Sequence, residues 1–346
     1  MKFRYTLTAG LALALLGTKT SWAETLDVAS TYPKNMPFLG ESAEVLAKNV
    51  EIVTGGALKL TIHGAGDLVP PLDVLPQVSS GAIPAGWDWI GYWGGTLPVT
   101  SLAGAMPFGL SPAEFVGWMW EGGGMEIVQK AYDPLNVKFL PCSVTAPEPG
   151  GWFNKEINSV EDLRGLRMRI SGLGGQALNR LGASTQMIPA GELYVALERG
   201  RIDATEFSLP SIDKSLGFAQ IAKYYYFPGW HQPASWNSFI INMDVWNGFD
   251  ETTRNAVTIA CQATVAWSLA AGPQPQPDVI EEFKEKGVEV RRFPDNVLLA
   301  LREASTAVLE EEAAKDAVFK EAYESMMAYA EKSRTWTDLQ VLPVSE

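Results

Sequence analysis

Apolar and polar residues follow two different periods along this chain, and the two periods alternate from one end to the other. Around residue 168, apolar residues alternate with Arg167 and Arg169, which is typical of a strand with one apolar face. In residues 39–53, apolar residues instead recur at the three- and four-residue spacing of a helix, and Gly55-Gly56 ends that pattern. The chain therefore predicts strands that alternate with helices.

The two periods divide most of the chain into predicted elements. The predicted strands are 26–30, 58–62, 83–90, 137–143, 166–170, 202–207, 224–227, 238–243 and 288–293. The predicted helices are 39–53, 70–81, 111–130, 176–181, 191–199, 251–271, 279–286 and 295–334. Residues 98–107 are expected as an apolar loop. Strands that alternate with helices indicate an α/β fold with parallel sheets covered on both faces.

Segments rich in proline and glycine suggest where the chain passes between domains. Residues 147–152 read Pro-Glu-Pro-Gly-Gly-Trp, in which the prolines stiffen the backbone and the glycines have no side chain. A second crossing is expected near residues 231–236, and prolines follow the long helix 251–271. We therefore predict a two-lobed clamshell with a hinge cleft and a long C-terminal helix. Lobe I comprises residues 24–147 and 233–272, and lobe II comprises residues 148–232 and 273–346.

The first residues have the pattern of a secretory signal peptide. Lys2 and Arg4 precede an apolar run at residues 11–16, and Ser21-Trp22-Ala23 fits the small-residue cleavage site. The run is too short for a membrane anchor, which needs about 20 apolar residues. We predict that residues 1–23 are removed and that the mature protein is exported to the periplasm.

Charge and residue counts exclude several classes of function. The formal net charge of −13 argues against binding to nucleic acid or to an anionic membrane, so an anionic ligand would need a local positive site. The two histidines, His63 and His231, are too few for a His-rich metal site, and neither lies near a Gly-x-Ser-x-Gly motif. Cys142 and Cys261 do not suggest a disulfide framework, and we do not expect them to pair, although the sequence leaves the bond open.

One stretch combines residues suited to an anionic ligand. Arg169 lies near the end of a predicted strand and faces the start of the next predicted helix, where backbone N–H groups also attract anions. Glu206 lies near the end of the strand 202–207, and open α/β sheets bind ligands at such ends. A positive and a negative side chain at one crevice would suit an anion that is accompanied by a cation.

Two other functions fit single features of the sequence. Residues 172–177, Gly-Leu-Gly-Gly-Gln-Ala, match the dinucleotide-binding fingerprint of an oxidoreductase, but the strand before them carries two arginines where a central parallel strand is apolar. Tryptophans near the expected crevice suggest stacking on a carbohydrate, but core packing accounts for most of them, and a buried arginine paired with glutamate counts against carbohydrate. These tryptophans are Trp87, Trp89, Trp93, Trp152, Trp230 and Trp236.

Longer runs resemble a known family. Residues 165–175 and 191–206, Gly-Leu-Arg-Met-Arg-Ile-Ser-Gly-Leu-Gly-Gly and Gly-Glu-Leu-Tyr-Val-Ala-Leu-Glu-Arg-Gly-Arg-Ile-Asp-Ala-Thr-Glu, resemble the solute receptors of TRAP (tripartite ATP-independent periplasmic) transporters. Residues 32–35, 150–153 and 224–231 resemble the subgroup that binds 2-oxo acids or lactate with a metal ion. The likeness covers nearly the whole mature chain. It implies a receptor that is not an enzyme and that delivers a small carboxylate to the membrane subunits of the transporter.

The resemblance also implies roles for particular residues. Arg169 matches the carboxylate-binding arginine, and Tyr92 matches an aromatic residue that donates a hydrogen bond to the ligand. Glu206 matches a metal-coordinating glutamate, and Phe207 matches a neighbour, usually tryptophan, that acts through its backbone carbonyl. Glu148 stands where the subgroup usually has glutamine.

Gln232 stands where the subgroup usually has glutamate, so the two departures together preserve the local charge. We expect the substrate at Arg169, Tyr92, Glu148 and Glu206, and the metal at Glu206, Phe207, Gln232 and Glu148. Because these ligands are oxygen atoms, the expected cation is Ca²⁺ or Na⁺. The long C-terminal helix allows a homodimer, as in some relatives.

Overall fold

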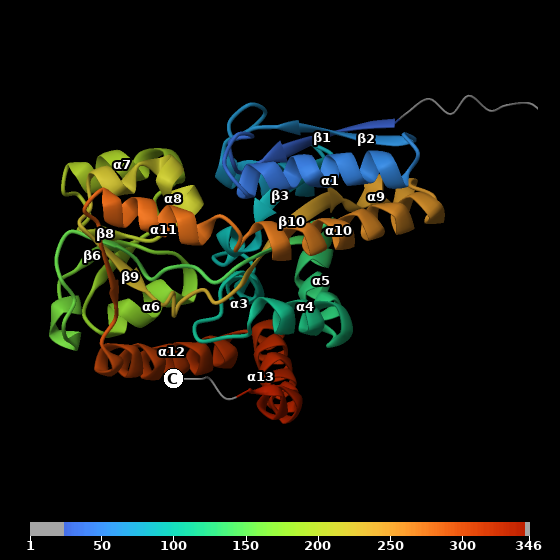
Figure 1. The fold of residues 1–346 in the computed structure, drawn as a ribbon. Coiled ribbons are helices and arrows are strands. Elements are labelled where there is room, and N and C mark those ends of the chain that lie inside the picture. Colours follow the sequence, from blue (N-terminus) through green and yellow to red (C-terminus); the bar gives the residue numbers. More distant parts are fainter. Residues whose placement is uncertain (1–23, 343–346) are drawn as a thin grey trace, which may run out of the picture.

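Residues 24–342, which the computed structural model describes, form two β-sheets with helices on both faces of each (Figure 1). The predicted signal peptide, residues 1–23, lies outside the described residues. Sheet A has five strands in the order β2-β1-β3-β10-β4, and sheet B has six strands in the order β11-β9-β5-β8-β6-β7. In both sheets, the strand order differs from the order along the chain.

Sheet A combines parallel and antiparallel pairing. It consists of β1 (Glu24–Ser30), β2 (Leu58–His63), β3 (Ala85–Trp89), β4 (Val137–Thr145) and β10 (Ser235–Asn242). β1 pairs in parallel with β2 and β3, whereas β10 runs antiparallel to β3 and β4. The prediction of a wholly parallel sheet is therefore wrong at β10, because the chain enters this strand directly from sheet B and in the opposite direction.

Helices bury both faces of sheet A. α1 (Leu39–Val53) and α10 (Glu251–Ala271) pack together and against β2 and β4. α2 (Val74–Ser79), α3 (Pro98–Gly104) and α5 (Gly124–Tyr132) pack against β3, β10 and β4, and α9 (Met243–Gly248) follows β10. In β10, Phe239 and Ile241 join one hydrophobic core and Ile240 joins the other, because successive side chains of a strand point to opposite faces.

Sheet B is built from shorter strands. It consists of β5 (Gly151–Phe153), β6 (Arg167–Arg169), β7 (Ser184–Gln186), β8 (Ala204–Thr205), β9 (Tyr224–Phe227) and β11 (Glu289–Arg292). β6 is parallel to both β7 and β8, β9 is parallel to β11, and β5 is antiparallel to β8 and β9. α6 (Gly172–Arg180) and α12 (Asp295–Lys315) lie on one side of this sheet (Figure 1). α7 (Ala190–Glu198), α8 (Pro210–Leu216) and α11 (Gln276–Glu285) lie on the other side.

The C-terminal segment consists of two helices where one was predicted. The predicted helix 295–334 is interrupted at Asp316, whose side chain accepts a hydrogen bond of 2.7 Å from the Phe319 N–H and so starts α13 (Ala317–Thr337). α12 packs against α6 beside sheet B, whereas α13 packs against α3, α4 (Pro112–Glu121) and α5 beside sheet A. The residue boundaries of the two lobes remain a prediction.

Two further segments differ from the prediction for local reasons. The predicted helix 111–130 is divided into α4 and α5 at Gly122-Gly123, where Gly123 has a φ of 83° that a helix does not allow. Residues 98–107 were expected as a loop, but Pro98 begins α3. Most of α3 is buried, so it lacks the polar face that would have produced a helical pattern in the sequence.

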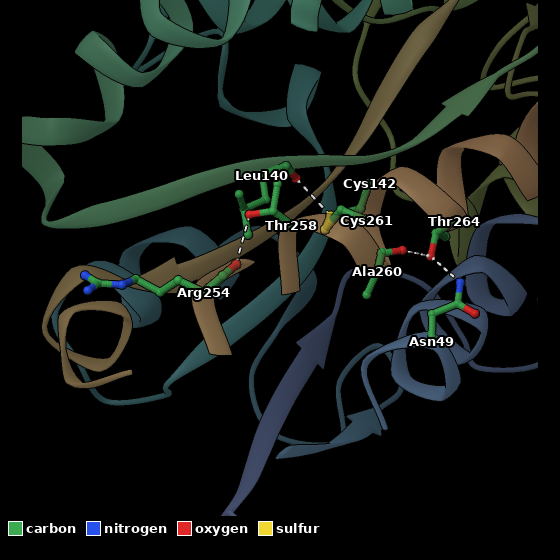
Figure 2. Close-up of a disulfide and its surroundings, with 8 residues drawn as sticks. All are labelled: Asn49, Leu140, Cys142, Arg254, Thr258, Ala260, Cys261 and Thr264. Carbon is green, nitrogen blue, oxygen red and sulfur yellow. Dashed lines mark hydrogen bonds between the residues drawn. A yellow bond between two sulfur atoms is a disulfide. The ribbon is translucent and has the colours of Figure 1, made fainter. Parts of the chain in front are cut away.

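A disulfide joins Cys142 of β4 to Cys261 of α10, with 4.2 Å between their Cα atoms (Figure 2). Both side chains are buried in the core between sheet A and its helices. The expectation that the two cysteines do not pair is therefore wrong, because the fold brings two residues 119 positions apart in the sequence to the same place. Among the described helices, we find none whose length and apolar character would let it cross a membrane.

Candidate functional site

A small cavity lies where the chain crosses between the two sheets. Two crossing segments, residues 146–150 and 228–234, run beside each other, and the Glu148 N–H donates to the Gln232 carbonyl at 3.3 Å. Their approach is so close that a Cβ atom on Gly229 would lie 1.9 Å from the Glu148 carbonyl oxygen. A larger residue at position 229 would therefore displace Glu148.

Residues from both sheets and from the crossing segments line this cavity. They are Tyr32, Leu39, Trp89, Tyr92, Thr145, Glu148, Arg169, Ser171, Phe207, Ser208, Gln232 and Ser235. Nine of these twelve side chains carry a hydroxyl, amide or charged group, so the cavity suits a small polar ligand.

Strand pairing brings Arg169 and Glu206 together. Arg169 is the last residue of β6, and Glu206 directly follows β8. These strands are parallel, with Arg169 opposite Thr205, and the Glu206 N–H donates to the Arg169 carbonyl at 3.2 Å. The carboxyl ends of parallel neighbours meet at one sheet edge, so residues 37 positions apart become adjacent.

The side chains of Arg169 and Glu206 form a buried ion pair. The Arg169 Nη1 donates to Glu206 Oε1 at 2.8 Å and to the Glu206 carbonyl at 2.6 Å, and each residue is only 3% exposed. The Arg169 Nε donates to the Ile188 carbonyl at 3.3 Å. Nη2, by contrast, meets only the Met187 sulfur at 3.6 Å, which is a weak acceptor. Arg169 thus keeps donor capacity at the cavity for an anionic ligand.

Glu206 is stabilised in its charged form. Burial alone raises the pKa of Glu206, but Arg169, His231 and the Ser171 N–H together hold this pKa below its usual value. The Ser171 N–H donates to Oε1 at 3.1 Å, at the start of α6. α6 begins at Gly172, earlier than predicted, and its first turn therefore supports Glu206 directly.

Glu148 is a second buried carboxylate with an incomplete set of partners. The Ser208 hydroxyl donates to Glu148 Oε1 at 2.9 Å, whereas Oε2 is buried without a hydrogen-bond partner. Burial raises the pKa of Glu148 well above its usual value, and the negative charge of Glu206 raises it further. A cation beside Oε2 would offset the cost of burying the Glu148 charge and the repulsion between Glu148 and Glu206.

Ser208 is itself positioned by a buried network in sheet B. Asp213 accepts a hydrogen bond of 3.2 Å from the Ser208 N–H, and also bonds of 2.9 Å from the Trp152 indole and 2.8 Å from the Tyr225 hydroxyl. Burial raises the pKa of Asp213 to about 7, although these donors oppose the shift. The network fixes the loop that supports Glu148.

The remaining predicted cation ligands also border the cavity. The Gln232 side-chain NH₂ donates to the Ser235 hydroxyl at 3.1 Å, which leaves the amide oxygen for a cation. Phe207 lines the cavity, and the Arg169 guanidinium lies 5.2 Å from the centre of its ring. The structure thus places the residues predicted from the sequence around one cavity. Their roles in binding the ligand and the metal remain predictions.

His231 is a neighbour of the site that sequence reasoning did not select. It lies on the second crossing segment, and its Nε2 is 3.8 Å from both Glu148 Oε2 and Glu206 Oε2. A Cβ atom on Gly174 would lie 2.8 Å from the His231 Cβ, so the first turn of α6 fits closely against the histidine. The position of His231 beside Gln232 was the available signal, but a single histidine in a loop does not by itself indicate a ligand.

Tyr92 lies on the sheet A side of the cavity, in the 3₁₀ turn Ile90–Trp93 that follows β3. Burial raises its pKa to about 12, while nearby Arg169 lowers it in part. Tyr92 is therefore a neutral hydroxyl donor at physiological pH. Tyr32, which sequence reasoning did not select, lines the same side and donates to the Asn237 side chain at 3.1 Å.

The tryptophans and the glycine fingerprint have structural roles. Of the six tryptophans considered for carbohydrate stacking, all are buried, and only Trp89 lines the cavity. In the fingerprint, Gly174 fits against His231, and a Cβ atom on Gly175 would lie 3.2 Å from the Ile170 carbonyl oxygen. These glycines serve helix packing.

The residues present fit a bound cation. One ligand atom from each of Glu148, Glu206 and His231 lies within 4.8 Å of the other two, and all three residues are buried. Glu148 Oε2 and both ring nitrogens of His231 lack hydrogen-bond partners. Unpartnered buried polar atoms that converge on one point are unfavourable unless an ion or another group joins them.

A charged cavity between two α/β units that are joined by crossing segments is the site of a bilobed ligand-binding receptor. Residues 29–316 match the bacterial extracellular solute-binding protein family 7, and the chain belongs to this family. It is a solute-binding protein of the TRAP transporter class. The predicted family, receptor class and extracytoplasmic location are thereby confirmed, in preference to the oxidoreductase and carbohydrate alternatives.

Three similar proteins illustrate the family. The chain is 35% identical to a monocarboxylate 2-oxoacid-binding periplasmic protein of Nostoc, over 91% of this chain and 86% of that protein. A TRAP periplasmic solute-binding protein of Colwellia psychrerythraea, solved with calcium and pyruvate, has a TM-score of 0.88 at 36% identity, over 92% of this chain and 98% of that one. The counterpart from Pseudoalteromonas atlantica, solved with sodium and pyruvate, has a TM-score of 0.87 at 34% identity, over 92% and 97%.

Proposed function

We propose that this protein binds a small 2-oxo or 2-hydroxy monocarboxylate, such as pyruvate or lactate, with a cation beside the ligand. The observation that carries the proposal is the buried set of Arg169, Glu206 and Glu148 at one small cavity. Arg169 would bind the carboxylate of the ligand. Glu206, Glu148, the Gln232 amide oxygen and the Phe207 carbonyl would hold the cation, and Tyr92 would donate a hydrogen bond to the ligand.

The charges at the cavity explain why a cation is needed. Glu206 and Glu148 would repel an anionic ligand, and two like charges about 4 Å apart cost on the order of several kcal/mol in a partly buried site. Arg169 offsets one of the three negative charges. A divalent ion such as Ca²⁺ leaves the cluster near neutral, and Na⁺ leaves about one negative charge. Both ions accept oxygen ligands, and each occurs with pyruvate in one of the similar structures.

The same arrangement favours transport over chemistry. The protein would bind its ligand without changing it, close by a hinge motion around contacts from both sheets, and deliver it to the membrane subunits of the transporter. A homodimer through the C-terminal helix remains a prediction.

A ligand panel tests this function. The purified mature protein is stripped of metal in sodium-free buffer and titrated by calorimetry with pyruvate, other 2-oxo acids, lactate and a sugar, each with and without Ca²⁺ or Na⁺. We expect binding of a small 2-oxo or 2-hydroxy acid that weakens when the cation is absent. Pyruvamide, which lacks the carboxylate, is the matched ligand control and should not bind. Tight binding of the sugar, or equal binding of pyruvamide, would contradict the proposal.

A further inference from the structure

A second cavity, open to solvent, borders the crossing segments. Pro147, Pro228 and Pro233 of these segments line it, and Glu148 borders both this cavity and the ligand cavity. The crossing segments therefore separate the two cavities. The second cavity, which we call the hinge groove, has a volume of about 650 Å³, within the range of small-molecule sites.

The other walls of the hinge groove come from both sides of the molecule. On the sheet A side, the loop between α3 and α4 contributes Phe108. On the sheet B side, α12 contributes Leu299 and Arg302, which lie three positions apart on one face of the helix. Phe227 and Arg292, the last residues of β9 and β11, complete this side. A molecule in the groove would thus contact both sides and the crossing segments.

Phe108 is held in the wall of the groove by a crossing segment. Its φ of 54° lies in the left-handed region, which a bulky side chain rarely adopts. The Phe108 N–H donates to the Trp230 carbonyl at 2.8 Å, and the centres of the two rings lie 6.0 Å apart. These contacts keep an aromatic ring at the groove despite the unfavourable backbone conformation.

The groove combines apolar surface with positive charge. Leu299 is 66% exposed, and the Arg302 guanidinium lies 4.3 Å from the centre of the half-buried Phe108 ring. Within residues 24–342, neither Arg292 nor Arg302 takes part in the ion pairs that the other arginines form. Asp295, in the first turn of α12, also borders the groove but pairs with neither arginine. Exposed apolar surface beside unpaired guanidinium groups suits an anion with an apolar body.

We propose that the hinge groove is a second binding site, which takes an amphipathic aromatic anion. The acid group of this anion lies between Arg292 and Arg302, and its rings lie on Phe108, Phe227 and Leu299. The aromatic rings and prolines of the lining offer flat surfaces, which suit a flat ring system, and each guanidinium provides a planar set of donors for the acid group. This inference goes beyond the proposed binding of a small carboxylate and does not depend on it.

An occupant of the hinge groove is also coupled to the ligand cavity. Because it contacts both sides and the crossing segments, it stabilises the arrangement of the two sheets in which the ligand cavity is formed. Each site should therefore strengthen binding at the other, and by the same factor, because a coupling free energy between two sites is reciprocal.

Fluorescence titration of the mature protein with 1-anilinonaphthalene-8-sulfonate, an aromatic anion, tests the site. We expect saturable binding of one molecule, and binding about fivefold weaker for N-phenyl-1-naphthylamine, which lacks the sulfonate. Arg169→Ala should leave dye binding unchanged, because Arg169 lies at the ligand cavity. Loss of dye binding in Arg169→Ala would place the dye in the ligand cavity and overturn the inference, as would equal binding of the neutral analogue.

Two substitutions at exposed positions of the groove locate the dye. Arg302→Gln should weaken dye binding about fivefold, and Leu299→Asn about threefold. The matched controls are Arg199→Gln, at the end of α7, and Leu269→Asn, on α10, because both residues are exposed and neither borders the groove. Dye binding that Arg302→Gln leaves intact, or equal losses in a variant and its control, would overturn the inference.

The coupling is measured by titrating the protein with pyruvate and Ca²⁺ in the presence and absence of saturating dye. We expect the dye to strengthen pyruvate binding by about fivefold in the parent protein, and to have a smaller effect in Arg302→Gln. Displacement of the dye by pyruvate would overturn the inference, and an unchanged pyruvate affinity would overturn the coupling. The dye titrations of the variants need no carboxylate, so a failure of the proposed function is distinguished from a failure of the second site.

Discussion

The two sides of the cavity differ in charge. The sheet A side is neutral and largely aromatic, with Tyr32, Trp89 and Tyr92 at the ends of its strands. The sheet B side carries the buried Arg169–Glu206 ion pair, and the crossing segments add Glu148 and His231. All the charged groups that we assign to ligand binding thus lie on sheet B or on the crossing segments.

This difference suggests an order of events in binding. In the proposed function, a charged ligand and its cation would gain most of their interaction free energy from sheet B and the crossing segments, which can act before the lobes close. The hydroxyl groups of sheet A then contribute smaller, directional contacts when the cavity closes. Contacts with sheet A would then drive the proposed hinge motion, because a ligand shifts a conformational equilibrium only through differential contacts with its states.

The largest expected effect is at Arg169. Arg169→Ala removes the partner of the ligand carboxylate and also leaves Glu206 without its cationic partner, so binding should weaken by about thirty-fold or more, equivalent to about 2–5 kcal/mol. Arg169→Lys should restore little, because lysine lacks the guanidinium fork. Calorimetry with the preferred carboxylate measures both variants.

Arg167→Ala is the matched control for Arg169. Arg167 lies two positions earlier on the same strand, but its side chain is half exposed and pairs with Asp203 at 2.6 Å. Its removal should leave affinity within about twofold, because exposed ion pairs contribute only about 0–1 kcal/mol. Equal losses at positions 167 and 169 would show that the arginines act through the stability of sheet B.

The next effect concerns Glu206 and the cation. Glu206→Gln removes a negative charge from the site of an anion, yet it should weaken carboxylate binding by about tenfold to a hundredfold, because the cation is lost with it. Chelation of the cation should produce a similar loss in the parent protein, and should have little further effect on the variant.

Glu156→Gln, in the segment that follows β5 (Gly151–Phe153), provides the corresponding control. Glu156 is a partly exposed carboxylate that pairs with Arg291 at 3.1 Å, away from the cavity. This variant should retain both its affinity and its sensitivity to chelator. Tighter carboxylate binding by Glu206→Gln would mean that no cation links Glu206 to the ligand.

A separate effect, on the free energy of unfolding and not on affinity, arises from the buried carboxyl group of sheet A. Burial raises the pKa of Asp88 from 3.8 to about 7, although the Ser238 hydroxyl and the Trp93 indole lower it in part. The folded protein therefore holds this proton more strongly than the unfolded chain. The contribution of Asp88 to stability is fully present below about pH 4 and is lost as the pH rises to about 7, with a slope of at most about 1.4 kcal/mol per pH unit.

Urea unfolding at several pH values measures this contribution. The free energy of unfolding of the parent minus that of Asp88→Asn should fall between pH 4 and pH 7 and become constant above that range. Carboxyl groups with lowered pKa values, such as Asp203, have the opposite dependence in both proteins and cancel in the difference. A flat difference would mean that Asp88 is ionised in the folded protein, so that the sheet A side also carries a buried charge.

The smallest expected effect is at Tyr92. Tyr92→Phe removes one neutral hydrogen bond to the ligand and should cost about 1 kcal/mol, or about fivefold in affinity. Tyr132→Phe is the control, because Tyr132 is also buried beside sheet A but its hydroxyl has no hydrogen-bond partner. A loss at Tyr92 as large as that at Arg169 would remove the distinction between the two sides of the cavity.

Local patterns in the sequence determined much of this architecture. The predicted helices 39–53 and 251–271 agree with α1 and α10, because each presents one apolar face at helical spacing. The positions of Arg169 and Glu206 at strand ends also followed from local periodicity and from the glycines nearby. The approximate crossing segments were visible as prolines and glycines. Each of these features depends on residues within a few positions of one another.

Tertiary structure decided the features that join distant residues. Cys142 bonds to Cys261, and β10 joins sheet A in the antiparallel direction. His231 lies close to Glu148 and Glu206. These residues are far apart in the sequence, so the local spacing of apolar residues does not predict that they meet. α3 was not predicted, because most of its residues are buried and it therefore has no polar face. Periodicity reports which face of an element is apolar, whereas packing of the whole chain decides which faces meet. The ion pair of the site was therefore foreseeable from strand ends, while the histidine beside it became visible only in the folded chain.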